Sequence, residues 1–371
     1  MSADQAPAKP RAGCLDWKSG LGLLISAVLL YWVFRGEDPW EILGYIRQAD
    51  PLLFLAAIFC TTFIFWLRAW RWKVILEPVS AHTTFRSRFA ATTIGFMGNN
   101  LLPARIGEFM RAYALSRAEN VPVVSAFTSL VLERLFDGLF VVAFLFISMG
   151  MPGFPGFSVE QGGTITTAAR TAGAFVFAAF VILTVMVLWP RPAVRVIEGM
   201  ASVLPRSLRR PIVDALEAFL SGVGVLRDPL LFLRTLVWTL AVWFTNAAGF
   251  WFGFRAFGFD LSFSAALFFQ SVIALSVSIP AGPGFFGTYH GAAVLVLATL
   301  WGYPEAPAKA FAVGFHLGGF IPVTLLGLYW ARRLGLSIRD VEQSEDVVES
   351  AVESATGTNP DRPGSAIARD S

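Results

Sequence analysis

Apolar runs of bilayer length recur along this chain and largely decide what it can fold into. A membrane-spanning helix needs about 20 mostly apolar residues. Eight runs approach or exceed that length: 19–34, 51–67, 121–149, 171–188, 230–254, 261–279, 285–301 and 308–330. Hydrophobic residues make up 55% of the chain and charged residues only 15%, whereas an average soluble domain is about 25% charged. We therefore predict an all-α, polytopic membrane helix bundle with about eight transmembrane helices.

Two further segments are interrupted by residues that disturb helices. The apolar piece 89–102 is short and contains glycines and asparagines, and 276–284 contains a Gly-Pro-Gly break. Such segments predict one or two re-entrant or broken helices in addition to the crossings. Residues 103–107 match 280–284 at three of five positions. That match fits an internal repeat, as in many transporters, and fits chance equally well, because Pro, Ala and Gly are common here.

Basic residues beside the apolar runs indicate the topology. They follow the second, fourth and last runs: Arg68, Arg71, Lys73, Arg86, Arg88, Arg191, Arg195, Arg206, Arg209, Arg210, Arg332 and Arg333. The positive-inside rule then predicts a multi-pass protein of the cell inner (plasma) membrane with both termini in the cytoplasm. The predicted parts are a cytoplasmic N-terminal segment at 1–18, a transmembrane domain at 19–333 with an amphipathic cytoplasmic loop at about 190–229, and a mostly disordered tail at 334–371.

Six charged residues lie where a membrane protein can least accommodate them: Arg105, Glu108, Arg111, Glu133, Arg134 and Asp137. The first three are spaced by three residues, and Glu133 and Asp137 by four, so each set lies roughly on one face of a helix. We expect arginines of the first set to meet carboxylates of the second in one polar pocket between packed helices. Ionisable residues at membrane depth usually face a protein interior or a water-filled cavity.

This pocket has two interpretations, which are compatible if substrate competes for the pairing. The charges can form a buried ion network that fixes helix packing. They can instead form a head-group or proton site. Helix breaks next to arginines favour an anion, because half-helix N-termini offer N–H donors and a guanidinium matches a phosphate bidentately.

Other polar residues are weaker candidates for substrate binding. Asn99 and Asn100 either cap the broken helix or bind substrate, and Pro280, Gly282 and Gly284 form the second break. Among the histidines, His290 is a candidate to line the cavity, His316 to bond between helices, and His82 to lie in a solvated loop. Trp66, Trp70 and Trp72 are interpreted as an interfacial aromatic belt.

Several function classes are not supported by the sequence. A net charge of +3 is too small to suggest nucleic acid as a partner. The spacing of histidines and cysteines fits no metal site, and we expect no cofactor. Hydrolase, metalloprotease and nucleotide-binding signatures are absent, so we do not expect an enzyme.

Three ordered motifs resemble a known prokaryotic membrane family. They are 98–108 with 111–113, Glu133-Arg134-Leu135-Phe136-Asp137, and 278–284 with Gly287-Thr288. Together they are similar to the lysylphosphatidylglycerol synthase transmembrane-region, or flippase-like, family. Tyr289-His290 stand where members often carry a glutamate, and the aminoacyl-transferase domain of full synthases is not expected.

The resemblance implies a lipid translocator that moves an anionic phospholipid or a polyprenyl-linked head group between leaflets. The alternative is a non-transporting scaffold, or an accessory subunit of a lipid or glycan assembly enzyme. A homo-oligomer and a partner lipid enzyme are both compatible with the sequence.

Overall fold

The computed structural model describes residues 17–36, 38–102, 105–151, 154–155, 228–279, 282–336 and five positions between 344 and 351. The predicted crossing at 171–188 lies outside these ranges. So do nearly all of the predicted loop at 190–229, of the N-terminal segment 1–18 and of the tail.

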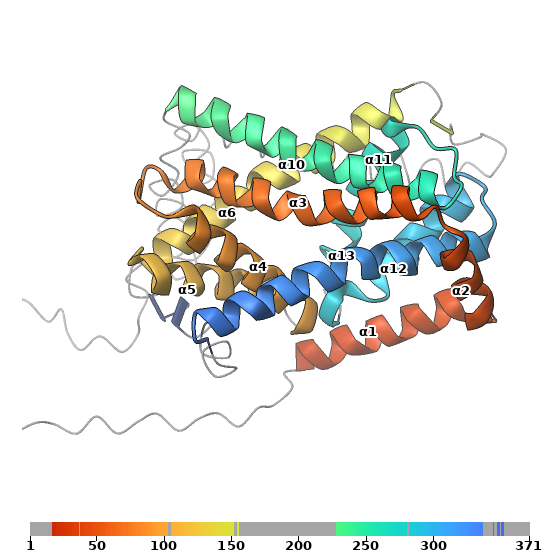
Figure 1. The fold of residues 1–371 in the computed structure, drawn as a ribbon, viewed down its shortest axis with the longest axis horizontal. Helices are drawn as coiled ribbons and strands as arrows, with labels where there is room; N and C mark the ends of the chain where they lie inside the picture. The colour runs from red at the N-terminus through yellow and green to blue at the C-terminus, as the bar shows by residue number, and fades with distance from the viewer. Residues whose placement is uncertain are drawn as a thin grey trace, which may run out of the picture.

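The described residues fold into helices, and no strand occurs among them (Figure 1). In chain order the helices are α1 (Trp17–Phe34), α2 (Pro39–Gln48), α3 (Pro51–Leu76), α4 (Phe85–Leu101), α5 (Gly107–Glu119), α6 (Val123–Met149), α10 (Pro229–Ala256), α11 (Phe263–Ser276), α12 (Thr288–Val294) and α13 (Glu305–Arg333). A 3₁₀ turn η3 (Pro283–Phe285) precedes α12, and a π-helix η4 (Leu295–Leu300) continues it. The predicted all-α membrane helix bundle is confirmed.

Four of these helical segments are long and apolar enough to cross a membrane: Pro51–Leu76, Pro229–Ala256, Pro283–Leu300 and Glu305–Arg333. Two of them, α3 and α10, begin with an aspartate followed by a proline. Asp50 accepts hydrogen bonds from the N–H groups of Leu52 and Leu53 at 2.9 and 3.0 Å. Asp228 does the same for the start of α10. These caps satisfy free amides at the helix start, and proline suits the first helical position, so the sequence itself fixes both starts.

Helices α4 and α5 form a hairpin that enters and leaves the bundle on the same side. At its base, the N–H and hydroxyl of Thr84 donate to the Glu119 carboxylate at 3.0 and 2.7 Å. Partial burial opposes ionisation of Glu119, but hydrogen bonds from Ser87 and Thr84 and the nearby Arg88 outweigh it and hold the pKa of this carboxyl below its usual value. The predicted re-entrant element at 89–102 is therefore present as the first arm of this hairpin.

Helices α11 and α12 form a second hairpin, at the predicted Gly/Pro break. The ring of Phe268, in α11, lies 5.5 Å from that of Trp301, which follows η4. Both ends of this hairpin therefore lie together. The 14 residues of α11 span about 21 Å at 1.5 Å per residue, less than the roughly 30 Å of a bilayer core. The apolar runs 261–279 and 285–301 were expected to be separate crossings. In the structure they are the two arms of this hairpin.

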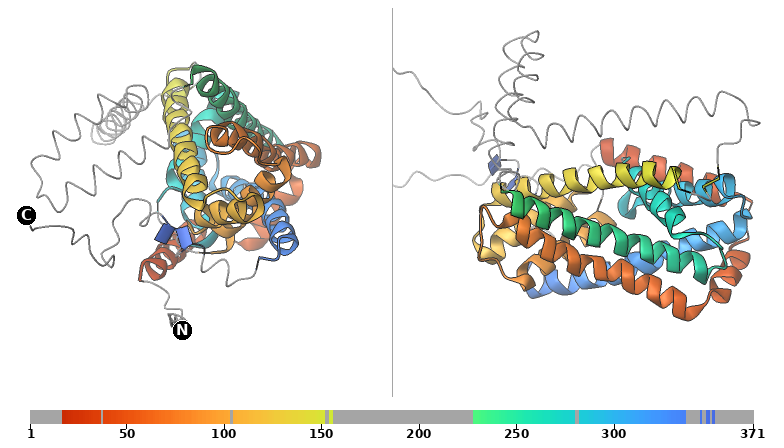
Figure 2. Two further views of the ribbon diagram at one scale, coloured as in Figure 1. Left: turned by 90° about the vertical axis from the view of Figure 1, so that its left-hand side faces the viewer. Right: turned by 90° about the horizontal axis from the view of Figure 1, so that it is seen from above.

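The two hairpins enter from opposite ends of the bundle, and their tips meet (Figure 1). The first hairpin's base lies at the C-terminal end of α13, where the Arg86 guanidinium stacks 5.2 Å from the Trp330 ring. The second leads directly into the N-terminal end of α13. At the tips, Arg105 donates a hydrogen bond to the backbone carbonyl of Val277 and stacks 5.4 Å from the Phe285 ring. Figure 2 shows α3 and α10 running side by side along the same bundle.

Candidate functional site

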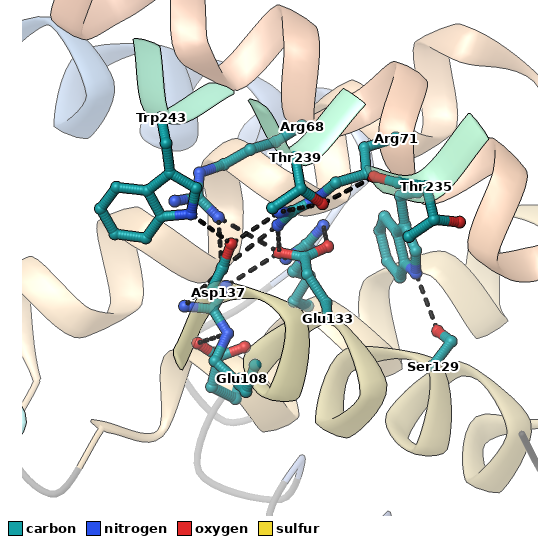
Figure 3. A network of polar contacts seen from close by, with 12 residues as sticks. Arg68, Arg71, Glu108, Ser129, Glu133, Asp137, Thr235, Thr239 and Trp243 are labelled. Carbon is teal, nitrogen blue, oxygen red and sulfur yellow. Dashed lines mark hydrogen bonds and ion pairs between the residues drawn. The ribbon is translucent and has the colours of Figure 1, made fainter. Parts of the chain in front are cut away.

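The centre of the site is formed by two carboxylates on one face of α6, as the spacing predicted (Figure 3). The side chain of Glu133 is fully buried and that of Asp137 is nearly so. Buried carboxylates are strongly destabilising unless they are paired and hydrogen-bonded. Their partners come from α3, α5, α6 and α10, so this pairing joins four helices.

Glu133 is held by arginines from three helices. Arg111 of α5 binds both carboxylate oxygens, at 2.8 and 3.0 Å. Arg71 of α3 and the neighbouring Arg134 reach the Oε1 atom at 2.9 and 2.8 Å, and Arg68 lies at 3.3 Å. The Arg111 contact is bidentate, the geometry in which guanidinium–carboxylate pairs are strongest.

Asp137 has a second set of donors. Arg71 binds both of its oxygens at 2.6 and 3.2 Å, and Arg68 approaches to 3.1 Å. The indole N–H of Trp243 on α10 donates to the same carboxylate at 3.0 Å. Because Arg71 contacts both carboxylates, it bridges the two halves of the network.

Arg68 and Arg71 were missed as site residues by the sequence reasoning, which placed them beyond the second crossing as topology determinants. Helix α3 instead continues to Leu76, and both arginines are buried inside the bundle. Two features of the sequence could have indicated that these arginines are buried: their three-residue spacing, and the apolar residues Val74, Ile75 and Leu76 that follow them. We define the arginine cluster as Arg68, Arg71, Glu108, Arg111, Glu133, Arg134 and Asp137.

Trp72 supports the cluster and does not belong to an interfacial belt, so the prediction was wrong for this one of the three tryptophans. Its side chain is completely buried. The Arg111 guanidinium lies 4.1 Å from the Trp72 ring centroid, and the indole N–H donates to the Ser129 hydroxyl at 2.8 Å. A cation over an indole face is stabilised further when it is desolvated.

The cluster has one exposed edge. The side chain of Arg134 is 41% exposed and that of Glu108 is 25% exposed, and their closest charged atoms are 3.8 Å apart. Arg105 interacts electrostatically with both, although its own hydrogen bond goes to Val277. The expectation that Arg105 joins the central pocket was therefore wrong, because its position in the break holds it at the hairpin tip.

The remaining candidates from the first break, Asn99 and Asn100, form hydrogen bonds within the protein. The side-chain oxygen of Asn99 accepts a hydrogen bond from the Gly107 N–H at 3.0 Å, which caps the start of α5. Asn100 donates to the Thr324 hydroxyl of α13 at 2.9 Å. Asn99 therefore joins the two arms of the first hairpin, and Asn100 ties this hairpin to α13.

The candidates from the second break lie away from the arginine cluster. The Gly282 N–H donates to the Ser26 hydroxyl of α1 at 2.8 Å, and Gly284 has a positive φ of 67°, which glycine adopts without strain. His290 is buried among aromatic rings at the start of α12. Pro280 lies outside the described residues. Within the described ranges, no group of three or more histidine, cysteine, aspartate or glutamate side chains could hold a metal ion.

Arg111→Lys tests how far guanidinium geometry stabilises this network. Lysine keeps the charge but loses one of the two bonds to Glu133 and the flat contact with Trp72. We expect a loss of about 2 kcal/mol in stability, from one charge-assisted hydrogen bond and a cation–π contact. Thermal unfolding in detergent measures it, with Arg333→Lys at an exposed position as control. Equal melting temperatures of the two variants would contradict the network as described.

The fold and this cluster together define a multi-pass, all-helical membrane protein with two opposed hairpins and a buried arginine–carboxylate network. The chain belongs to the family described as the lysylphosphatidylglycerol synthase TM region, whose model matches residues 20–327.

Two relatives illustrate the range of this similarity. The chain is 27% identical over 315 residues to a protein named glycosyltransferase AglD from Haloferax volcanii, covering 78% of this chain and 50% of that protein. It is 25% identical over 335 residues to a UPF0104 membrane protein from Methanothermobacter thermautotrophicus, covering 87% of this chain and 97% of that protein. The chain thus spans about half the length of the first relative and nearly all of the second.

Proposed function

We propose that this protein moves a lipid with an anionic head group, a phospholipid or a polyprenyl-linked lipid, between the leaflets of the plasma membrane. Its two termini lie in the cytoplasm, and it carries out no catalytic step of its own. The observation that carries this proposal is the positive charge at the exposed edge of the arginine cluster.

The charge balance of the cluster favours an anion. Four arginines face three carboxylates, which leaves one positive charge in excess, and Arg105 at the adjacent tip adds a second. A network that served packing alone has no need of such an excess, since uncompensated charge at membrane depth is costly. Arg134 is the most exposed arginine of the cluster, so a phosphate can approach it without breaking the buried pairs of Arg71 and Arg111 with Glu133.

The hairpins support transport more than a static role. Interrupted helices are tolerated at membrane depth only where protein or water covers their free backbone groups. Paired interruptions near the midplane are typical of transporters. Here both interruptions meet at the Arg105 contact with Val277, next to the exposed edge of the cluster. A head group that binds Arg134 therefore lies beside the joint between the two hairpins.

A scaffold, or an accessory subunit of a lipid or glycan assembly enzyme, is the alternative. The observation that favours it is the complete pairing of Glu133 and Asp137, which suits a fixed network. The relative named as a glycosyltransferase is compatible with such a role beside a glycan enzyme. In this case the arginine cluster holds the bundle together and binds no lipid.

Arg134→Gln separates the two functions. Losing one charge-assisted hydrogen bond to a phosphate costs about 1.5–3 kcal/mol, so we expect binding of an anionic phospholipid to weaken about tenfold or more. Melting should change little, because three other arginines still neutralise Glu133. Arg255→Gln is a matched control, since the Arg255 side chain is also 41% exposed and pairs with an exposed aspartate, Asp260.

The measurements are native lipid retention and movement of fluorescent phosphatidylglycerol in proteoliposomes, with phosphatidylcholine for comparison. Reduced retention and movement of the anionic lipid in Arg134→Gln alone would support the translocator. Unaltered retention in both variants, or a wild-type protein that moves neither lipid, would favour the scaffold.

A further inference from the structure

A second polar group lies between the other hairpin and α13, away from the arginine cluster. It consists of Tyr289 and His290 at the start of α12 and His316 in the middle of α13. The Tyr289 and His316 rings are stacked with centroids 4.3 Å apart. The two imidazole rings lie 5.0 Å apart. We call these three residues the histidine group.

The histidine group contains buried polar atoms without hydrogen-bond partners. His290 is 2% exposed and Tyr289 is 6% exposed. The Nδ1 atoms of both histidines and the Tyr289 hydroxyl are buried and make no hydrogen bond. Such atoms are rare in native proteins, and each requires a physical explanation. A free Nδ1 on a neutral imidazole is an atom that can accept a proton.

The surroundings of these atoms restrict what can bind. Phe286 is stacked on His290 at 5.6 Å and lies 4.9 Å from His316, while Phe34 of α1 meets His290 edge-on at 5.8 Å. Rings packed this closely leave no room for a sugar or a phosphate. Aromatic faces do stabilise a cation that is placed against them. The chemistry therefore suits a proton carried by an imidazole.

We propose that His290 and His316 form a proton-binding site that senses the position of the second hairpin. In the conformation described here an imidazolium at this site is costly, because His290 is buried, His316 is partly buried and no carboxylate of the described residues pairs with either ring. The site takes up a proton when the tip of this hairpin moves and admits water. Protonation then favours the conformation in which the tip has moved.

The groups facing the histidines are consistent with this linkage. Among the titratable groups of the described elements packed around them, only His290 acts electrostatically on His316, and Tyr289 is the third member of the group. Arg105 is a charged residue that contacts this hairpin's tip, where it is stacked over Phe285. No carboxylate in the described part of the chain pairs with either ring. The protonation state therefore depends on access to water rather than on a fixed counter-charge.

The tip is suited to such a movement. Phe285 has a φ of +58° between the glycines Gly284 and Gly287, at +67° and +98°. A positive φ in a phenylalanine is an uncommon and strained conformation. Phe286 is adjacent to this residue and is stacked on His290. A shift of the tip therefore moves one of the aromatic rings that pack against the histidines. The next step rests on the proposed function. In a translocator, the same linkage would couple a pH gradient across the membrane to the contact between the tips of the two hairpins.

The test uses histidine signals of the full-length protein and needs no lipid transport, so its outcome is independent of the proposed function. The sequence contains only three histidines, and His82 in an exposed loop serves as an internal reference. NMR of ¹³C,¹⁵N-histidine-labelled protein in bilayers follows their protonation between pH 8 and pH 4. We expect both His290 and His316 to become protonated in this range. In His290→Gln, the His316 transition should move to higher pH by about half a unit or more, because a like charge nearby is removed.

Thermal unfolding supplies a second readout. Wild-type protein should lose stability as pH falls, because opening exposes histidines that bind protons. His290→Gln/His316→Gln should lose distinctly less over the same range, whereas His82→Gln should behave as wild type. His316→Phe keeps an aromatic ring at this position in case the glutamine variants fold poorly. Signals of His290 and His316 that stay neutral to pH 4, or equal pH dependence in wild type and the double variant, would overturn the proposal.

Discussion

Glu133→Gln is expected to lower the free energy of unfolding by about 3–5 kcal/mol, the usual cost of removing one member of a buried ion pair. Glutamine has nearly the shape of glutamate but carries no charge. Arg68, Arg71 and Arg111 then remain buried with Asp137 as the one buried carboxylate left in the arginine cluster. Four guanidinium groups lie within 3.3 Å of Glu133, more than contact either other carboxylate of the arginine cluster, so this substitution removes four ion pairs at once.

Thermal unfolding of purified protein in detergent measures this loss, with Asp260→Asn as control. The Asp260 side chain is 87% exposed in its pair with Arg255, and exposed pairs contribute about 0–1 kcal/mol. The double variant Arg111→Met/Glu133→Gln should recover part of the loss, because it removes one of the unpaired charges. If Glu133→Gln melts like Asp260→Asn, the buried network does not exist in this form.

Gly107→Ala is expected to destabilise the first hairpin by about 3 kcal/mol or more, at the upper end of overpacking effects. A Cβ atom at Gly107 would lie 1.9 Å from the Gly95 carbonyl oxygen and 2.5 Å from the Asn99 side-chain oxygen. The first of these is a backbone atom of α4, so a side-chain rotation cannot relieve the clash. The two helices must separate, which moves Arg111 away from Glu133 and weakens the Asn99 cap.

The matched control is Gly138→Ala on α6, where a Cβ meets nothing within 4 Å. Alanine in a helix is better than glycine by about 0.5–1 kcal/mol, so this variant should melt at or slightly above the wild-type temperature. Hydrogen exchange of α4 and α5 localises the effect, since only Gly107→Ala should speed exchange in that hairpin. A Gly107→Ala protein with wild-type melting and exchange would rule out the close α4–α5 contact.

The two hairpins carry different chemistry. The first brings Arg111 and Glu108 of α5 to the arginine cluster, where charges are paired and one edge is exposed. The second brings His290 next to His316 of α13, among aromatic rings. Arg105 is the contact between them. Both proposals therefore predict that Arg105 variants alter hairpin movement more than they alter the stability of the cluster.

The amino-acid sequence by itself determined the helices, their breaks and the face that Glu133 and Asp137 share. These features are local: apolar runs match the bilayer thickness, Asp-Pro pairs set the starts of α3 and α10, and a spacing of four residues puts two side chains on one side of a helix. The pairing of Arg111 with the carboxylates also followed, because few other partners were available at that depth.

Only the tertiary structure decided which other arginines belong to the cluster. Arg68 and Arg71 have the sequence environment of topology determinants, and their burial follows from the packing of α3 against α6 and α10. Arg105 lies six residues before Arg111 yet points to the other hairpin. The opposed entry of the two hairpins was likewise outside the reach of local patterns, because hydropathy fixes how deep a residue lies but not which helix lies beside it.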